Sequence, residues 1–201
     1  MRLLLHMCCG PCSCYPVKKL REEGIEPVGW FFNPNIHPYK EWEQRLETAK
    51  EFAGKVGLEM RAEEQYQLRE FLRRALAAEK TGGRCQMCYS WRLGEAARYA
   101  SENGFTAFTS TLFYSIYQRH DLMKETAAFF AQKYGVDFYY EDFRLGWQEG
   151  IDISRRLELY RQPYCGCVFS EEERYSRELR RARKKAAKEK KRQRLLEAAA
   201  V

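Results

Sequence analysis

Short apolar segments alternate with segments of helical periodicity along most of the chain, and no other feature of the sequence restricts the fold as strongly. Residues 1–7 are largely apolar and lead toward a Gly-Pro pair, which is typical of a short buried strand. The alternation predicts an α/β fold in which helices cover both faces of a parallel sheet. Further strands are expected at 26–33, 58–64, 105–112 and 136–143, and helices at 15–23, 39–56, 66–80, 84–104 (after an initial loop) and 120–134.

Cysteine and polar residues follow the expected strands at the positions where a parallel sheet binds its ligands. Cys8–Cys14 come after the first strand, Asn33–His37 after the second and Thr111–Asp121 after the fourth, while Asp142 lies at the end of the last. Ligands of parallel sheets gather at the carboxyl ends of the strands. We therefore expect these segments to form one site, with His6 beside it or buried and hydrogen-bonded.

The cysteines occur in closely spaced groups, which suit the binding of several thiolates to one metal centre. A structural zinc site would use two pairs and leave four cysteines unexplained. A redox dithiol would lack its usual aromatic-Gly-Pro context around the Cys-x-x-Cys pair. An iron–sulfur cluster with a second metal nearby fits the number of sulfurs best. The groups are Cys8, Cys9, Cys12 and Cys14, then Cys85 and Cys88, then Cys165 and Cys167.

The composition is that of a folded protein with no membrane-spanning segment. The 201 residues include 45% hydrophobic side chains, which is enough for a core. No apolar run reaches the roughly 18 residues that a membrane span requires, and the first residues do not fit a secretory signal. We therefore expect a cytoplasmic protein that does not act in a membrane and has no structural disulfides.

Positive charge is concentrated at the C-terminus. The net charge of the chain is +7, yet the segment from Arg174 onward holds 12 Lys and Arg against 3 Glu, which leaves the preceding residues at −2. This segment lacks Gly and Pro and is rich in helix-forming residues. We expect a catalytic domain over 1–173 and a basic helical tail over 174–201. The tail is either a solvated helix or an arm that binds a polyanion such as RNA.

Six motifs resemble those of one family, the cobalamin-independent epoxyqueuosine reductases, or QueH family. The resemblance extends from about Leu3 to about Ser170, with the motifs in the family's order, and leaves out the basic tail. The motifs are HMCCGPCS, FFNPNIHPYKEWEQR, RCQMCYSWRL, TSTLFYSIYQRHD, EDFR and LYRQPYCGCVFS.

The resemblance implies an oxidoreductase that acts on tRNA. It would convert epoxyqueuosine to queuosine at the wobble position of the anticodon, the last step of queuosine biosynthesis, with electrons from an unidentified reductant. The implied fold is Rossmann-like, of the adenine-nucleotide alpha-hydrolase type. Because CCGPC stands where a phosphate-binding loop would follow the first strand, we do not expect ATP to be used.

The implied cofactors are a [4Fe–4S] cluster and a second iron beside it. Some family members have Asp at the position of Cys12, and a carboxylate or a thiolate can bind iron. Cys14 falls outside the family pattern and is not expected to be a ligand. The expected cluster ligands are Cys8, Cys9, Cys85 and Cys88, and those of the second iron are Cys12, Cys165 and Cys167.

Removal of an epoxide oxygen needs two electrons and two protons, so an acid should lie near the metal. The candidates are His37, Tyr117, His120, Asp121 and Asp142, although Asp142 could instead cap a turn. The modified base must be turned out of the anticodon loop and held by stacking and phosphate contacts. Candidate stacking residues are Trp30, Phe31, Tyr39, Tyr114 and Tyr117, and other candidate substrate contacts are Asn33, Asn35, Arg45, Arg92, Ser115, Arg119, Arg161 and Gln162.

Two other functions are compatible with the same residues. An iron–sulfur-dependent tRNA sulfurtransferase could share the fold, but such enzymes generally need ATP. A zinc-stabilised RNA-binding module would be colourless and inactive. The colour and the metal and sulfide content of protein purified without oxygen would separate these functions.

Overall fold

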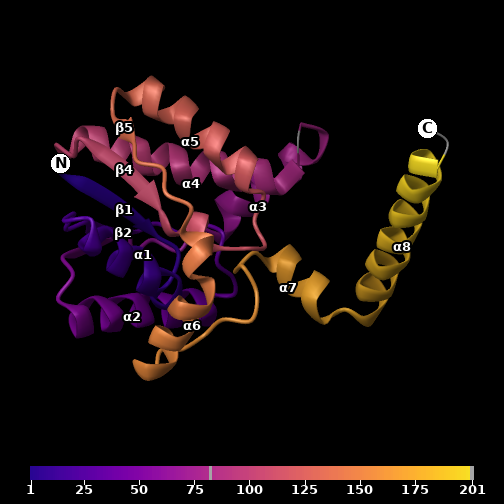
Figure 1. Ribbon diagram of the computed structural model, residues 1–201, viewed down its shortest axis with the longest axis horizontal. Helices are drawn as coiled ribbons and strands as arrows, with labels where there is room; N and C mark the ends of the chain where they lie inside the picture. The colour runs from indigo at the N-terminus through magenta and orange to yellow at the C-terminus, as the bar shows by residue number, and fades with distance from the viewer. Residues whose placement is uncertain (82, 200–201) are drawn as a thin grey trace. The chain divides into compact units, whose positions relative to one another are not determined.

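The computed structural model describes residues 1–81 and 83–199, which separate into two units, Met1–Arg161 and Gln162–Val201 (Figure 1). The sheet described in the first unit has five parallel strands in the order β3-β2-β1-β4-β5. This confirms the expected α/β class with a parallel sheet. The strands are β1 (Leu3–Met7), β2 (Val28–Phe31), β3 (Met60–Ala62), β4 (Ala107–Ser110) and β5 (Asp137–Phe138).

The central strand β1 fixes where the site forms. All five of its residues are buried, as expected for a short apolar strand with neighbours on both sides. His6 pairs in register with Trp30 of β2 and with Ser110 of β4. From β1 the chain adds β2 and then β3 on one side of this strand, and afterwards adds β4 and β5 on its other side. The direction in which strands are added therefore reverses between β1 and β4. A ligand site is expected at the carboxyl ends of these two strands.

Helices cover both faces of the sheet, as the sequence predicts. Figure 1 shows α4 and α5 on one side of the strands and α1, α2 and α6 on the other. Short 3-10 helices connect several elements, namely η1 (Ala78–Lys80), η2 (Thr111–Tyr114) and η3 (Phe143–Gly146). The helices of this unit are α1 (Gly10–Glu22), α2 (Tyr39–Val56), α3 (Leu68–Ala77), α4 (Gly83–Glu102), α5 (His120–Tyr134) and α6 (Trp147–Arg156).

Helix α1 begins at Gly10, five residues before the helix expected over 15–23. Pro11 does not stop the helix, because it occupies the first turn, where the missing N–H has no partner to lose. The glycine in CCGPC allows α1 to approach α2 closely. A Cβ added at Gly10 would lie 2.6 Å from the carbonyl oxygen of Thr48, so a larger residue would push the two helices apart.

Two further differences concern the helices around the site. Cys85 and Cys88 lie on the first turns of α4 rather than in a loop before it. Helix α6 was not predicted, because Gly150 and several polar residues interrupt its apolar pattern. Gly150 has a packing role, since an added Cβ would lie 2.4 Å from the hydroxyl of Tyr114.

The second unit contains α7 (Val168–Tyr175) and α8 (Arg177–Ala199), of which α8 is the expected basic helix. The boundary expected between residues 173 and 174 falls inside α7, whereas the two units separate between Arg161 and Gln162. Cys165 and Cys167 therefore belong to the second unit. In the part of the chain that the structure describes, no helix has the length and apolar character that crossing a bilayer requires.

Candidate metal centre

Three thiols lie together where β1 meets α1. The Sγ atoms of Cys8, Cys9 and Cys12 all lie within 4.8 Å of one another, and those of Cys8 and Cys9 are 3.8 Å apart. Cys9 is completely buried, while the other two are partly exposed. Side-chain sulfur atoms at this spacing are typical of a metal site, because bound thiolates must converge on one centre.

The local backbone explains why these sulfurs converge. Cys9 is the N-cap of α1, and its Sγ accepts a hydrogen bond from the backbone N–H of Cys12 (3.3 Å). The hydroxyl of Thr111 fixes Cys8 from the adjacent strand end. It accepts from the backbone N–H of Cys8 (2.9 Å) and donates to its Sγ (3.1 Å). The thiols are thus held by the β1–α1 turn and by the start of η2.

The three thiols favour a negative charge on Cys8. Hydrogen bonds from the thiols of Cys12 and Cys9 lower the pKa of Cys8 well below its usual value, and the charge of Arg92 and the hydroxyl of Thr111 act in the same direction. The pKa of Cys9 is raised, chiefly by burial. The pKa of Cys12 is raised because its thiol donates to its neighbours. These directions favour a thiolate on Cys8 that accepts from the two neighbouring thiols, and a bound cation would favour ionisation of all three.

A buried polar network lies within the sheet beside the thiols. The Nδ1 atom of His6 is 2.7 Å from the hydroxyl oxygen of Ser110, and its Nε2 atom is 2.9 Å from the carbonyl oxygen of Phe32. Burial lowers the pKa of His6 to about 3, and the charge of Arg92 acts in the same direction. His6 is therefore neutral at neutral pH and ties β1 to both neighbouring strands.

A second branch of the network joins α4 to the end of β1. Asn33 donates to the carbonyl oxygen of Met7 (2.9 Å), and its own side-chain oxygen accepts from Nη2 of Arg92 (2.6 Å). Both side chains are buried. Arg92 is therefore an internal residue in this structure rather than a surface group, and the expected contact with a tRNA phosphate stays a prediction.

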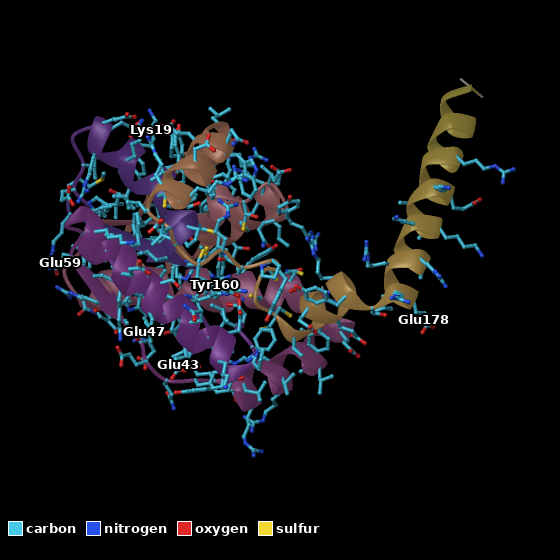
Figure 2. All side chains as sticks on the ribbon, turned by 90° about the horizontal axis from the view of Figure 1, so that it is seen from below. Lys19, Glu43, Glu47, Glu59, Tyr160 and Glu178 are labelled. Carbon is cyan, nitrogen blue, oxygen red and sulfur yellow. The ribbon has the colours of Figure 1, made fainter. Side chains whose placement is uncertain are left out.

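Arg45, another expected substrate contact, is also buried. It is 2% exposed, and its guanidinium forms an ion pair with Glu41 at 2.7 Å. Glu41 also accepts a hydrogen bond from Tyr160, which is marked in Figure 2 (2.7 Å). Trp30 and Phe31, two of the candidate stacking residues, are also buried, at 4% and 0% exposure.

The remaining cysteines lie outside the group of three. Cys85 and Cys88 are one turn apart at the start of α4. Because α4 leads back to the start of the parallel strand β4, its first residue lies at the carboxyl edge of the sheet. Cys14 is buried on α1, its Sγ lies 3.6 Å from the carbonyl oxygen of Gly10, and burial raises its pKa to about 12. In the second unit, Cys165 is exposed and Cys167 is buried.

The candidate acids have different environments. Asp142 caps η3, and its carboxylate pairs with Arg144 at 2.6 Å, which lowers the pKa of Asp142. Asp142 thus caps the turn and pairs with Arg144, and its role as the acid stays a prediction. His120 lies 3.0 Å from the hydroxyl of Tyr140, and burial lowers the pKa of this histidine. Asp121 is exposed in the first turn of α5.

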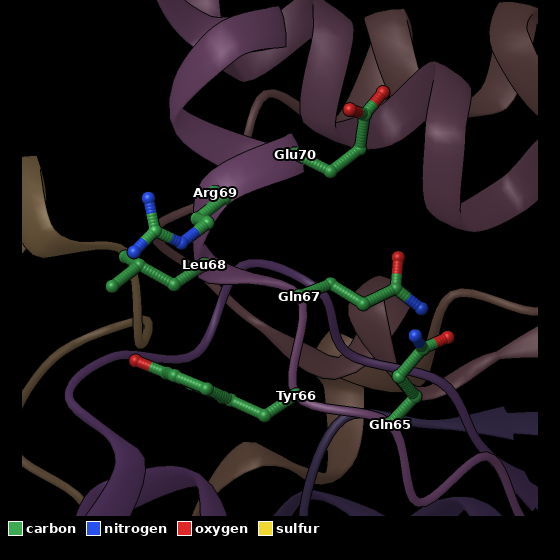
Figure 3. A pocket seen from close by; sticks show the side chains of 6 residues that line it. All are labelled: Gln65, Tyr66, Gln67, Leu68, Arg69 and Glu70. Atoms are coloured by element: carbon green, nitrogen blue, oxygen red, sulfur yellow. The ribbon is translucent and has the colours of Figure 1, made fainter.

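His37 is buried at the end of the loop that follows β2. Its Nδ1 atom is 3.1 Å from the hydroxyl oxygen of Tyr66, and burial lowers the pKa of His37 to about 4. Tyr66 also lines a pocket of about 490 Å³ formed by Gln65–Glu70 (Figure 3). The lining of this pocket is separate from the three grouped cysteines.

The expected substrate contacts fall into exposed and internal groups. Tyr117 is 80% exposed and packs edge-on against Trp147, with ring centroids 5.7 Å apart, and Arg119 is exposed nearby in the chain. Ser115 accepts a hydrogen bond from the backbone of Tyr117 (3.3 Å). Arg161 donates to Ser154 of α6 (2.6 Å). Asn35 is 1% exposed, and Gln162 is half-buried in the second unit.

Two residues of the site were missed by sequence reasoning. Thr111 was included only within a segment, although it contacts Cys8 directly. The sequence predicts only a stacking role for Tyr114, but this last residue of η2 is buried and packs against Tyr15 of α1 and Trp147 of α6. Burial and the nearby Cys12 raise its pKa, so its hydroxyl remains protonated and donates to the carbonyl oxygen of Trp147 (2.7 Å). The only sequence signal was the polar segment that directly follows β4.

The fold and the site together define a class of protein, a Rossmann-like α/β protein with a thiol-rich centre at the carboxyl edge of its parallel sheet. The sequence model of one family, described as epoxyqueuosine reductase QueH, matches residues 3–173. The chain belongs to this family.

Curated relatives resemble the chain over most of its length. An epoxyqueuosine reductase QueH of Dehalococcoides mccartyi is 39% identical over 88% of this chain and 96% of the relative. One of Thermotoga maritima is 33% identical over 91% of this chain and 97% of the relative. Among solved structures, a predicted subunit of tRNA methyltransferase from Methanocaldococcus jannaschii matches with a TM-score of 0.46 and 12% identity, covering 73% of this chain and 76% of that one.

Proposed function

We propose that the protein reduces epoxyqueuosine in the anticodon of tRNA to queuosine, the last step in the biosynthesis of this nucleoside. Membership of the epoxyqueuosine reductase family supports the activity. The structural observation that carries the proposal is the convergence of three thiols at the end of β1. The substrate is a tRNA with epoxyqueuosine at the wobble position, and we expect the reaction to take place in the cytoplasm.

The grouped thiols fit a bound metal. Two sulfurs on one tetrahedral metal, with bonds of about 2.3 Å, lie roughly 3.8 Å apart, and Cys8 and Cys9 have this separation. We propose that cysteine thiolates hold a [4Fe–4S] cluster and an adjacent second iron, which would supply electrons one at a time. The proposed cluster ligands are Cys8, Cys9, Cys85 and Cys88, and the proposed ligands of the second iron are Cys12, Cys165 and Cys167.

The reaction sets what the side chains must do. Conversion of the epoxide to an alkene breaks both C–O bonds, consumes two electrons from an external reductant and two protons, and releases the oxygen as water. The modified base must leave the anticodon stack to reach the thiols at the end of β1. Tyr117 is exposed on the segment that follows η2. Thr111, the first residue of η2, contacts Cys8. We propose that Tyr117 stacks on the base and that Arg119 contacts the adjacent phosphate.

The test uses full-length protein purified without oxygen. Iron and sulfide are measured first, and tRNA rich in epoxyqueuosine is then incubated with the protein and a reductant. We expect mass analysis of the nucleosides to show the loss of one oxygen atom from epoxyqueuosine. Cys9→Ser serves as the metal-deficient control, and tRNA without epoxyqueuosine as the substrate control.

The same experiment separates the alternatives. A tRNA sulfurtransferase would add sulfur to a nucleoside and require ATP. A zinc-stabilised RNA-binding module would be colourless and would bind tRNA without changing any nucleoside. Either result would contradict the proposed reduction.

A further inference from the structure

Arg92 carries a positive charge that is buried without a carboxylate partner among the described residues. Its side chain is 4% exposed. Nη2 donates to Asn33, which is neutral, and the buried Nε has no hydrogen-bond partner in the described part of the chain. Arg45 is equally buried, yet it pairs with Glu41 at 2.7 Å. Arg92 therefore differs from a buried arginine that is neutralised within the fold.

An unpaired buried charge is costly. Removing an ion from water carries a penalty of several kcal/mol unless an opposite charge compensates it. Asn33 holds Arg92 close to the thiols. Its side chain accepts a hydrogen bond from Arg92 and donates one to the carbonyl oxygen of Met7 (2.9 Å), the residue directly before Cys8. The hydrogen bonds through Asn33 thus connect Arg92 to the residue that precedes the thiols. His6 lies in the same buried network, but an imidazole carries no negative charge in either protonation state, so of these groups only the thiols can supply one.

We propose that Arg92 is the counter-charge of the metal–thiolate centre, held in place by Asn33, and that it sets the affinity of the centre for metal and its reduction potential. This inference rests on the metal centre proposed above. Several thiolates around one centre leave it with net negative charge, and reduction adds more. A fixed guanidinium nearby therefore stabilises the loaded centre and, within it, the reduced state.

Metal binding by the metal-free, full-length protein tests the charge directly. Co²⁺ is titrated without oxygen, and its thiolate absorption is followed. We expect Arg92→Gln to weaken Co²⁺ binding roughly tenfold, since an amide can still donate to Asn33 but carries no charge. Arg92→Lys should restore most of the affinity. Arg98→Gln is the matched control, because Arg98 lies on the same helix but is partly exposed and paired with Glu95 and Glu102.

A second variant neutralises the charge without removing it. Asn33→Asp would place a carboxylate against Arg92, but it would also remove the amide that donates to Met7. Asn33→Leu removes the same donor without adding a charge, and we expect Asn33→Asp to bind Co²⁺ more weakly than Asn33→Leu. If Arg92 had only a structural role, the Asp variant, which still holds Arg92, would bind Co²⁺ at least as well as the Leu variant. Asn33→Asp therefore keeps the inference testable if Arg92→Gln does not fold.

The outcomes separate this inference from the proposed metal centre. Wild-type affinity in Arg92→Gln, or an affinity in Asn33→Asp no weaker than in Asn33→Leu, would overturn the role of Arg92 and leave the metal centre intact. A loss that Arg92→Lys does not restore, together with a lower melting temperature of the metal-free protein, would assign Arg92 to packing instead. Failure of the wild-type protein to bind Co²⁺ would overturn both proposals. After reconstitution with iron, a lower midpoint potential in Arg92→Gln would support the inference independently of activity.

Discussion

The hydroxyl of Thr111 both accepts a hydrogen bond from the backbone N–H of Cys8, at 2.9 Å, and donates one to the Sγ of Cys8, at 3.1 Å. One side chain thus orients a candidate metal ligand through its backbone and its sulfur. The contact also joins the ends of β1 and β4, the two strands between which the strand order reverses.

Thr111→Val should weaken metal retention. The substitution keeps the shape of the side chain but removes both hydrogen bonds, and the loss of one such bond costs about 1 kcal/mol. We expect less bound iron after anaerobic purification and a lower melting temperature. Thr111→Ser keeps the hydroxyl and serves as the control. Equal iron content in the Val and Ser variants would show that the hydroxyl does not orient Cys8.

Cys9→Ser and Cys14→Ser should differ in iron content. Serine is a good N-cap, so Cys9→Ser preserves the start of α1 while removing a sulfur from the group of three. We expect it to lose iron without a large loss of helix by circular dichroism. Cys14→Ser should retain iron, because this thiol lies outside the group. A similar iron loss in both variants would mean that the ligand set includes Cys14.

The role of Tyr117 can be resolved by two substitutions. Tyr117→Phe keeps the ring, and Tyr117→Ala removes it, so a stacking role predicts near-normal turnover in the first and a raised KM for tRNA in the second, with a loss of roughly 1–3 kcal/mol of binding. A role in proton donation predicts that Phe is as damaging to kcat as Ala. Steady-state kinetics with epoxyqueuosine-containing tRNA distinguishes these results.

Acid should destabilise the fold partly through His37. Its folded pKa of about 4 lies below the ordinary value of 6.5, so the unfolded chain binds a proton in this interval that the folded chain does not. Stability should be independent of His37 above pH 6.5 and fall as the pH decreases toward 4. His37→Gln should flatten this part of the pH profile in urea unfolding, while His6 continues to contribute. An unchanged slope would refute a neutral buried His37.

The basic tail should contribute affinity for tRNA rather than chemistry. Residues from Arg174 onward carry a net charge of +9, and each phosphate contact releases counterions. Deletion of 176–201 should weaken tRNA binding most at low salt and reduce the salt dependence, with little change in turnover at saturating tRNA. A full-length variant with Lys184, Lys185 and Lys188 changed to Gln serves as the control, because it removes three charges but keeps the helix. An unchanged salt slope would exclude the arm, and a large drop in melting temperature would indicate packing.

The sequence predicts the sheet well because its strands are short, apolar and separated by helical periodicity. It fails where local signals conflict with tertiary packing. The Gly-Pro pair at Gly10 and Pro11 indicates a turn, yet the proline is accommodated in the first helical turn. Helix α6 is obscured by Gly150, whose lack of a side chain serves the packing of Tyr114 and not the helix itself.

The sequence predicts where the site forms, but not the buried hydrogen bonds and charges that surround it. Strand order alone brings the cysteines after β1 to the ligand-binding edge. Burial of Arg45 and Arg92 could not be foreseen, because arginines on amphipathic helices are usually solvent-exposed. The contact between Thr111 and Cys8 depends on the register of β1 against β4, which places His6 opposite Ser110. Such a register is not encoded in either segment alone.

The packing at Gly150 of α6 has a consequence for the stability of the proposed metal centre toward oxygen. Tyr114 occupies the space that a side chain at position 150 would fill, and its ring lies close enough to Cys12 for the sulfur's charge to raise its pKa. The ring of Tyr114 therefore packs tightly against α6 at Gly150. Gly150→Ala should displace the ring of Tyr114 and shorten the lifetime of the proposed iron centre in air, measured as bleaching, while activity assayed without oxygen changes less.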